Sequence, residues 1–298
     1  MKAITKQSDK KTAFTIIELL TVMSIIVILI GLLLPSLNMV KRYAKEVRQR
    51  AQFHSIESAM ELFSGNSEYG GYPPSEALDK VGGVDYCGAM KLCEAMVGQD
   101  LAGFHPESRF LADCTNGTSG YYLYDNPPSS GLSPDAATNL KARKGPYLQT
   151  ENANAYRLSQ LYGTGNTSPF TNENLFVLCD VYNRVKNQET GKGIGMPILY
   201  YKANTSNTVH DPNGTFPTAA GDNGYIYNYL DNDELVHLGP AGVTHPLDGT
   251  GTNFYAITQD KRISITTGWP HKPDSYILIS AGFDGIYGTN DDIFNFEK

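Results

Sequence analysis

The longest uninterrupted run of hydrophobic positions lies near the start of the chain, from Phe14 to Leu34. It contains a single charged side chain, Glu18. As a helix rising about 1.5 Å per residue, the run would be roughly 31 Å long, the thickness of a bilayer core. It is longer than the apolar region of a usual signal peptide and ends in Leu-Pro-Ser, without the small residues of a cleavage site. The pattern therefore predicts one membrane-spanning helix, whose orientation is not decided by its flanks because basic residues lie on both sides.

Beyond Pro35 the hydrophobic pattern becomes periodic. The apolar positions that recur at helical spacing are Val40, Ala44, Val47, Ala51, Ile56, Met60 and Phe63. Ser64-Gly65-Asn66 then supplies residues that end helices. We expect an amphipathic helix that continues the membrane helix, with a basic face between Lys41 and Arg50 that is solvated or meets anionic lipid or acidic neighbours.

From Gly65 onward the hydrophobic runs are short and separated by Gly, Pro and Asn. Runs with the composition of strands lie at 197–203, 224–230, 253–258 and 275–280, and the run 175–182 fits a buried helix or a strand. We expect an α+β fold, in which the long N-terminal hydrophobic helix packs on a small antiparallel sheet with loop-rich insertions. The largest insertion, at 127–171, is predicted to hold at most short helices.

Charge argues against one class of partner. The chain carries 31 Asp and Glu against 24 Lys and Arg, a net charge of -7, and its body has no block of basic residues. Binding to nucleic acid depends on clustered basic side chains that neutralise phosphates. We therefore expect no nucleic-acid partner.

The four cysteines, Cys87, Cys93, Cys114 and Cys179, form no zinc-binding pair motif. Outside the cytoplasm they would permit two disulfides with three possible pairings, and they fit small buried residues equally well. The histidines show no HExxH spacing, and no GxSxG or P-loop motif is present. We therefore predict that the chain is not an enzyme.

Glu18 is the informative residue of the apolar run. A carboxylate at the centre of a membrane helix costs about 2.5 to 3.5 kcal/mol, and less towards the interface, so it either reaches headgroup water or has a partner. The string from Lys10 to Leu20, KKTAFTIIELL, resembles the prepilin signature that prepilin peptidase recognises. This resemblance implies cleavage between Ala13 and Phe14 and methylation of the new Phe14 terminus, although the family usually carries Gly where this chain has Ala13.

The same resemblance assigns roles within the helix. It implies that Glu18 pairs with the Phe14 amine of a neighbouring subunit as helices pack into a filament, and that Pro35 is a helix-kinking proline. It divides the chain into a leader at 1–13, a transmembrane and assembly helix at 14–64 and a globular pseudopilin-like domain at 65–298. In the body, the stretches 71–75, 143–148 and 195–200 are similar, in order, to landmarks of the major pseudopilin of type II secretion.

An acidic loop near the C-terminus offers oxygen ligands for a hard cation, with Asp284, Asp291 and Asp292 set among glycines. The spacing is not that of an EF-hand, and spacing alone favours a plain pair of turns. The resemblance to the major pseudopilin, which ends in a similar calcium-binding loop, implies a Ca2+ site. Asp284 and Asp292 match its acidic positions best, and Asp291 and Ser280 are further candidates.

The resemblance implies a structural subunit of a type II secretion pseudopilus or related type IV pilus-like filament, which supports protein secretion. Its partners would be prepilin peptidase, copies of itself and other pseudopilins, the inner-membrane assembly platform and membrane lipid. It would cross the inner (cytoplasmic) membrane once, with its globular domain in the periplasm or outside. The alternative is a singly anchored extracytoplasmic ligand-binding domain that joins no filament and uses the 127–171 region for its ligand.

Overall fold

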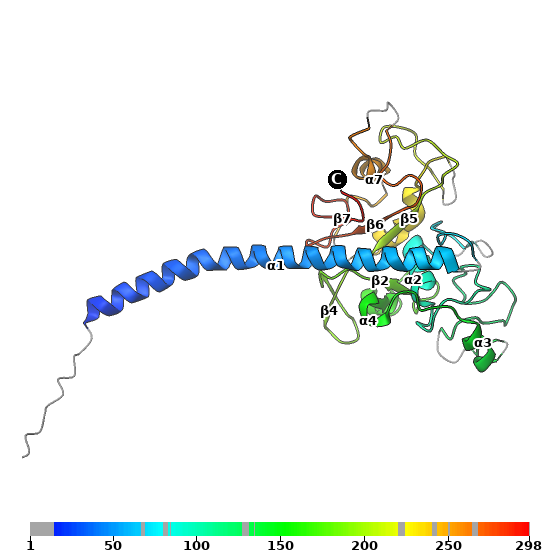
Figure 1. Ribbon diagram of the computed structural model, residues 1–298, viewed down its shortest axis with the longest axis horizontal. Helices are drawn as coiled ribbons and strands as arrows, with labels where there is room; N and C mark the ends of the chain where they lie inside the picture. The colour runs from blue at the N-terminus through cyan, green and yellow to red at the C-terminus, as the bar shows by residue number, and fades with distance from the viewer. Residues whose placement is uncertain are drawn as a thin grey trace, which may run out of the picture. The chain divides into compact units, whose positions relative to one another are not determined.

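A computed structural model of the chain describes most of it. The described residues are 15–66, 69–79, 83, 85–126, 131–133, 135–219, 224–239, 243–249, 251–263 and 268–297. Their contacts divide the chain into two compact units, Met1–Ala44 and Lys45–Lys298. Helix α1 runs from Ile16 to Asn66 and contributes to both units (Figure 1). The predicted α+β class is confirmed, because this long apolar helix is followed by small antiparallel sheets and short helices.

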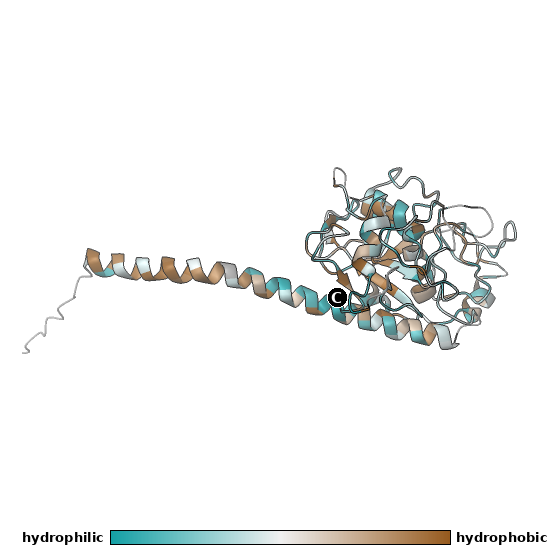
Figure 2. Ribbon diagram, turned by 90° about the horizontal axis from the view of Figure 1, so that it is seen from above, coloured by the Kyte–Doolittle hydropathy of each residue, from teal (hydrophilic) through white to brown (hydrophobic). Residues whose placement is uncertain are grey.

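The first unit consists of the apolar part of α1. Every side chain described between Thr15 and Ala44 is exposed, including a long series of Ile, Leu, Val and Met side chains. Figure 2 shows the ribbon of this part of α1 coloured mostly as hydrophobic. Within the described residues, α1 is the one helix long and apolar enough to cross a membrane. Both single membrane spans and N-terminal signal sequences have this property.

The second part of α1 buries one face in the globular unit. The buried positions recur every three or four residues and are Gln49, Gln52, Phe53, Ile56, Ala59, Met60 and Phe63. The apolar face was therefore correctly predicted from Ile56 onward. It was wrong at Val47 and Ala51, which are exposed, because the two buried glutamines face inward to hydrogen-bond buried backbone.

Helix α2 (Gly88–Val97) lies at the centre of the globular unit, and all ten of its residues are buried. Its first residue is glycine because a Cβ there would lie 2.3 Å from the Tyr200 carbonyl oxygen. Its two charged side chains are hydrogen-bonded: Lys91 donates to backbone carbonyls, and Glu94 accepts from Tyr86 and Gln99. The sequence pattern did not predict α2, in which the charged Lys91 and Glu94 are buried together with the apolar residues.

The described residues of the globular unit form three small antiparallel sheets, and α2 contacts strands β2 and β5 of two of them. The largest has the order β5-β6-β7, formed by β5 (Leu199–Lys202), β6 (Tyr276–Ser280) and β7 (Ile293–Phe294). Leu199 pairs with Ile279, and Ile279 also pairs with Phe294. The two-stranded sheets are β1 (Ala155–Arg157) with β2 (Phe176–Leu178), and β3 (Val185–Lys186) with β4 (Gly193–Ile194). Strands were correctly predicted at 197–203 and 275–280, and the ambiguous run 175–182 contains strand β2.

The remaining helices are short. They are α3 (Ala136–Ala142), α4 (Thr150–Ala153), α5 (Leu158–Tyr162), the 3-10 helix η1 (Tyr229–Asn232), α6 (Asp233–His237) and α7 (Gly251–Thr258). The strand predicted at 253–258 was wrong, because Phe254, Tyr255 and Thr258 form the buried face of helix α7. The strand predicted at 224–230 was also wrong, since Asn228 caps η1 there. The described part of 127–171 holds helices α3 to α5 and strand β1.

The four cysteines are all described, and each is a buried free thiol. The sequence left open whether the cysteines form disulfides or are small buried residues. In the structure they are buried residues without disulfides. Burial raises the pKa of the Cys87 thiol to about 12 and raises those of the other three cysteines as well.

Candidate functional site

At the N-terminal end, the expected cleavage site Ala13–Phe14 lies outside the described residues. Glu18 is described and belongs to a capping box in the first turn of α1. The Thr15 amide and hydroxyl donate to Glu18 Oε2 at 2.9 and 2.7 Å, and the Glu18 amide donates to the Thr15 hydroxyl at 3.3 Å. This reciprocal pattern satisfies helix N–H groups that otherwise have no partner. Thr15 is therefore the partner that Glu18 has within its own chain.

Pro35 lies inside α1, which continues as a helix on both sides of it. A proline within a helix removes one backbone hydrogen bond, so the helix is locally weaker at this position. The side chain of Pro35 is outside the described atoms.

At the other end of the chain, the acidic residues lie in the 281–292 loop that joins β6 to β7. Gly282 starts this loop with a φ of 65°, and a Cβ there would lie 2.1 Å from the Asp291 carbonyl oxygen. A side chain at position 282 would therefore separate the two ends of the loop.

The loop brings two of the four expected ligands together. The Thr289 hydroxyl lies 2.9 Å from Asp284 Oδ2 and 2.7 Å from Asp291 Oδ1, and the Asp284 amide donates to Asp291 Oδ2 at 2.9 Å. Burial and the neighbouring Asp291 raise the pKa of Asp284. Burial also acts to raise the pKa of Asp291, but its hydrogen bonds with Thr289 and Asp284 outweigh this and lower it. Two like charges held this close favour either one shared proton or a bound cation.

The other two expected ligands are directed elsewhere. Asp292 is buried and accepts a hydrogen bond of 2.7 Å from the Gly288 amide. This hydrogen bond stabilises the turn between the two residues. The Ser280 hydroxyl donates to Asp180 Oδ2 at 2.9 Å, and Ser280 is fully buried at the end of β6. Of the expected ligands, the exposed Asp284 and the half-buried Asp291 therefore form the pair.

Asp180 is a site residue that the sequence reasoning missed. Its Oδ1 accepts hydrogen bonds from the Tyr182 and Met196 amides at 3.0 and 3.2 Å. Burial raises its pKa to about 6, against these hydrogen bonds and the one from Ser280. No spacing rule could have linked it to Ser280, which lies 100 residues later in the chain.

The segment around Asp180 is also attached to the second part of α1. Gln52 Nε2 donates to the Cys179 carbonyl at 2.9 Å, Gln49 Oε1 accepts from the Val181 amide at 3.1 Å, and Lys45 Nζ donates to the Tyr182 carbonyl at 3.0 Å. Through Asp180 and Ser280, the helix is connected by hydrogen bonds to the start of the acidic loop.

The donor set of this loop fits a hard cation, because it consists of carboxylate and hydroxyl oxygens. The described residues contain no group of three or more His, Cys, Asp or Glu side chains placed to hold a metal ion. A Ca2+ ion here would take Asp284 and Asp291 and complete its six to eight ligands with backbone carbonyls and water.

Comparisons with known proteins identify no family for this chain. No family model, curated protein or solved structure matches the chain.

Proposed function

We propose that this chain is a structural subunit of a type II secretion pseudopilus or a related type IV pilus-like filament. The observation that carries the proposal is the first part of α1, an exposed apolar helix with one carboxylate, Glu18, in its first turn. A continuous apolar surface of this size is unfavourable in water and marks contact with lipid or with other apolar helices. The KKTAFTIIELL string at its start supports the filament over a plain membrane anchor.

Before assembly, α1 holds the subunit in the inner membrane with its globular unit in the periplasm. Prepilin peptidase then removes residues 1–13 and leaves Phe14 with a free amine, which becomes methylated. In the filament, this amine on one subunit pairs with Glu18 of the next and replaces the Thr15 contacts of the capping box. Because an unpaired charge is costly in low dielectric, this pairing sets the register of neighbouring helices and favours assembly.

The globular unit would remain on the outer surface of the filament, and Ca2+ would hold its C-terminal loop. Asp284 and Asp291 supply the two carboxylates, and the cation removes the repulsion between them. Since Asp180 and Ser280 connect the start of the loop to the segment that binds Gln49 and Gln52, an ordered loop stabilises the packing against α1. The partners are other pseudopilins, copies of the same chain and the inner-membrane assembly platform.

The decisive experiment is the intact mass and N-terminal sequence of the full-length protein isolated from the membranes of its host. We expect a mature chain that begins with N-methylated Phe14. The variant Ala13→Gly, which restores the usual family residue, is the matched control and should be cut at the same bond. A terminus at Met1, or one beyond Leu34, in the wild type would contradict the proposal.

A further inference from the structure

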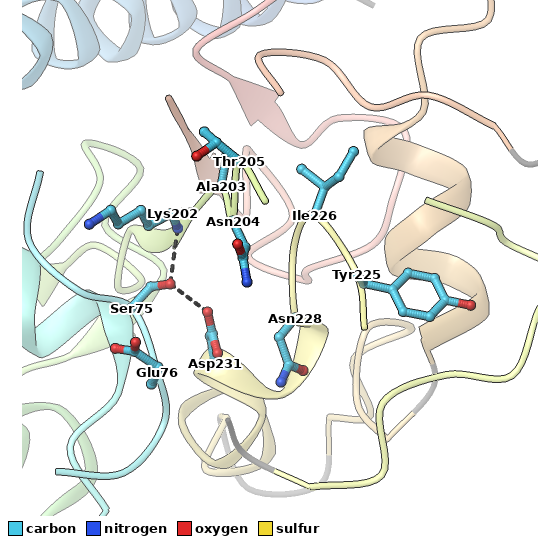
Figure 3. Close-up of a pocket in the computed structure, with 10 residues that line it drawn as sticks. All are labelled: Ser75, Glu76, Lys202, Ala203, Asn204, Thr205, Tyr225, Ile226, Asn228 and Asp231. Carbon is cyan, nitrogen blue, oxygen red and sulfur yellow. Dashed lines mark hydrogen bonds between the residues drawn. The ribbon is translucent and has the colours of Figure 1, made fainter. Parts of the chain in front are cut away.

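Buried titratable groups of the globular unit differ in how their hydrogen bonds respond to protonation. Asp231 lies in a cavity of about 330 Å³, together with Ser75, Glu76 and Lys202 (Figure 3). The Ser75 hydroxyl donates to Asp231 Oδ2 at 2.5 Å and accepts from the Lys202 amide at 3.0 Å. Because a hydroxyl can donate to a carboxylate or accept from a carboxylic acid, this pair can persist in either protonation state.

His245 has a partner that cannot adapt in this way. The Tyr287 amide donates a hydrogen bond of 3.0 Å to His245 Nδ1. Since a backbone N–H can only donate, Nδ1 must carry a lone pair, and the neutral ring must carry its proton on Nε2. Protonation would place a second N–H at Nδ1, opposite the Tyr287 N–H. The hydrogen bond can therefore form only with the neutral ring.

The imidazole ring of His245 is held in a closely packed site. It is 2% exposed, and its centroid lies 5.1 Å from that of the Tyr287 ring. At the other edge of the imidazole, a Cβ at Gly239 would lie 2.2 Å from Nε2, so only glycine leaves room for the ring there. Nε2 is buried and has no hydrogen-bond partner among the described residues. The ring therefore cannot turn Nδ1 away from the amide without losing this packing.

The hydrogen bond connects two segments that are far apart in the chain. His245 follows helix α6, and Tyr287 lies in the 281–292 loop between β6 and β7. The contact extends to the next residue of each segment, since a Cβ at Gly288 would lie 2.9 Å from Pro246 Cβ. Loss of the hydrogen bond would therefore loosen the loop where it packs on the segment after α6.

The charged groups around His245 do not replace this hydrogen bond. Burial lowers the pKa of His245, and the Asp248 carboxylate opposes this only in part. Asp248 also pairs with His237 of α6, whose Nδ1 lies 3.3 Å away, and Asp233 of α6 accepts from the Gly249 amide. The carboxylates of the 281–292 loop accept hydrogen bonds from amides within the loop and are Asp284, Asp291 and Asp292.

We propose that His245 is an acid-sensitive contact that holds the 281–292 loop at neutral pH and releases it when Nδ1 is protonated. The proton comes from solvent, and the Tyr287 N–H then donates to water. The proposal does not depend on filament assembly or on a cation in the loop.

The direction of the effect follows from proton binding. In the open state the imidazole has its ordinary pKa of 6.5, and in the closed state its pKa is lower. Below pH 6.5 the open state therefore binds more protons than the closed state, and the free energy of opening falls as the pH falls.

The test is hydrogen–deuterium exchange of the full-length chain in detergent micelles with a calcium chelator, followed by mass spectrometry of peptides that contain Tyr287. Protection is the exchange rate of an unstructured peptide at the same pH divided by the measured rate. We expect the protection of the wild type to fall about tenfold between pH 7 and pH 5. His245→Asn should remove this fall, because Asn Oδ1 can accept from the Tyr287 amide and does not titrate.

His54→Asn, at an exposed histidine of α1, is the matched control and should behave as the wild type does. A second measurement needs only the wild type and applies if His245→Asn does not fold. Exchange of the imidazole Cε1 hydrogen, followed in the peptide that contains His245, gives its titration midpoint, which we expect below 6.5. An equal fall in protection in the wild type and His245→Asn, or a midpoint at or above 6.5, would overturn the proposal.

Discussion

The Ser280 hydroxyl donates a hydrogen bond of 2.9 Å to Oδ2 of Asp180, a carboxyl group that lies 100 residues earlier in the chain. Asp180 Oδ1 accepts from two backbone amides as well, those of Tyr182 and Met196. One buried carboxyl group therefore joins the end of β6, the residues before β5 and the segment that hydrogen-bonds to α1.

This carboxyl group should make stability depend on pH. Burial raises the pKa of Asp180 from 3.8 to about 6, so between these values the folded chain binds more protons than the unfolded chain. The free energy of unfolding therefore falls as pH rises through this window. Relative to Asp180→Asn, we expect the wild type to lose about 2 kcal/mol between pH 4 and pH 7.

Urea denaturation of both proteins across this pH range, in buffer with a calcium chelator, measures the effect. Parallel pH profiles for the wild type and Asp180→Asn would show that Asp180 titrates with its ordinary pKa.

Calcium should stabilise the protein through the Asp284 and Asp291 pair. A ligand that binds only the folded state adds about 2.7 kcal/mol at a concentration of 100 times Kd. We expect Ca2+ to raise the Tm of the wild type, and Asp284→Asn to abolish this rise. The substituted side chain carries no charge that would repel Asp291. The Tm of the variant without calcium should therefore equal or exceed that of the wild type.

Asp274→Asn is the control for the calcium measurement, since Asp274 is an exposed carboxylate outside the loop. A thermal shift that is the same in Asp284→Asn and the wild type would remove the loop from the calcium proposal.

Glu18 should be required for assembly and dispensable for membrane insertion. In Glu18→Gln the side chain keeps its size and loses the charge that would pair with the Phe14 amine. We expect filament incorporation to fall at least tenfold while the amount of membrane-bound subunit stays unchanged. Sheared-filament fractions and membrane fractions, compared by immunoblot, measure the two quantities.

Glu46→Gln is the matched control on the same helix, because Glu46 is a partly exposed carboxylate that pairs with Arg50. Normal incorporation of Glu18→Gln would favour the alternative of a singly anchored ligand-binding domain.

Two adjacent residues of α1 test the packing of its second part. Phe63 is fully buried, with edge-to-face contacts to Phe104 and Tyr147 at centroid distances of 5.0 and 5.5 Å. Leu62 is 52% exposed. Phe63→Ala should lower the free energy of unfolding by about 3 to 5 kcal/mol, and Leu62→Ala by less than about 1.

Denaturation monitored by circular dichroism gives both values. Similar losses for the two variants would mean that Leu62, too, is buried in solution.

The cysteines should be protected in the folded protein and available in the unfolded one. All four are buried free thiols, and burial raises their pKa values above the ordinary range, so little thiolate forms at neutral pH. We expect almost no iodoacetamide adducts in native buffer and four after denaturation without reductant. Two or fewer adducts after denaturation would indicate that disulfides have formed.

The local pattern of hydrophobic and polar residues predicted those helices and strands that are determined by residues close together in the chain. The apolar run after Thr15, the buried stripe at Ile56, Met60 and Phe63, and two strands of the main sheet could all be read from periodicity and composition. The Asp284 and Asp291 pair lies within one short loop, so the sequence could also indicate that these carboxylates are close together.

Contacts between distant segments were decided by the tertiary structure. The run 253–258 became helix α7 because burial of Phe254 and Tyr255 on one side prevailed over the strand composition of the segment. Helix α2 is buried on all sides because the fold covers it completely, its charged Lys91 and Glu94 included.

The sequence by itself determined the apolar N-terminal helix, its single carboxylate and the α+β character of the body, since these follow from side chains a few residues apart. The folded chain alone decided that Ser280 binds Asp180, that Gln49 and Gln52 face inward, and that Glu76 and Asp231 share a cavity. The physical reason is that these hydrogen bonds and this burial depend on contacts between segments far apart in the chain. The periodicity of hydrophobic residues carries no information about such contacts.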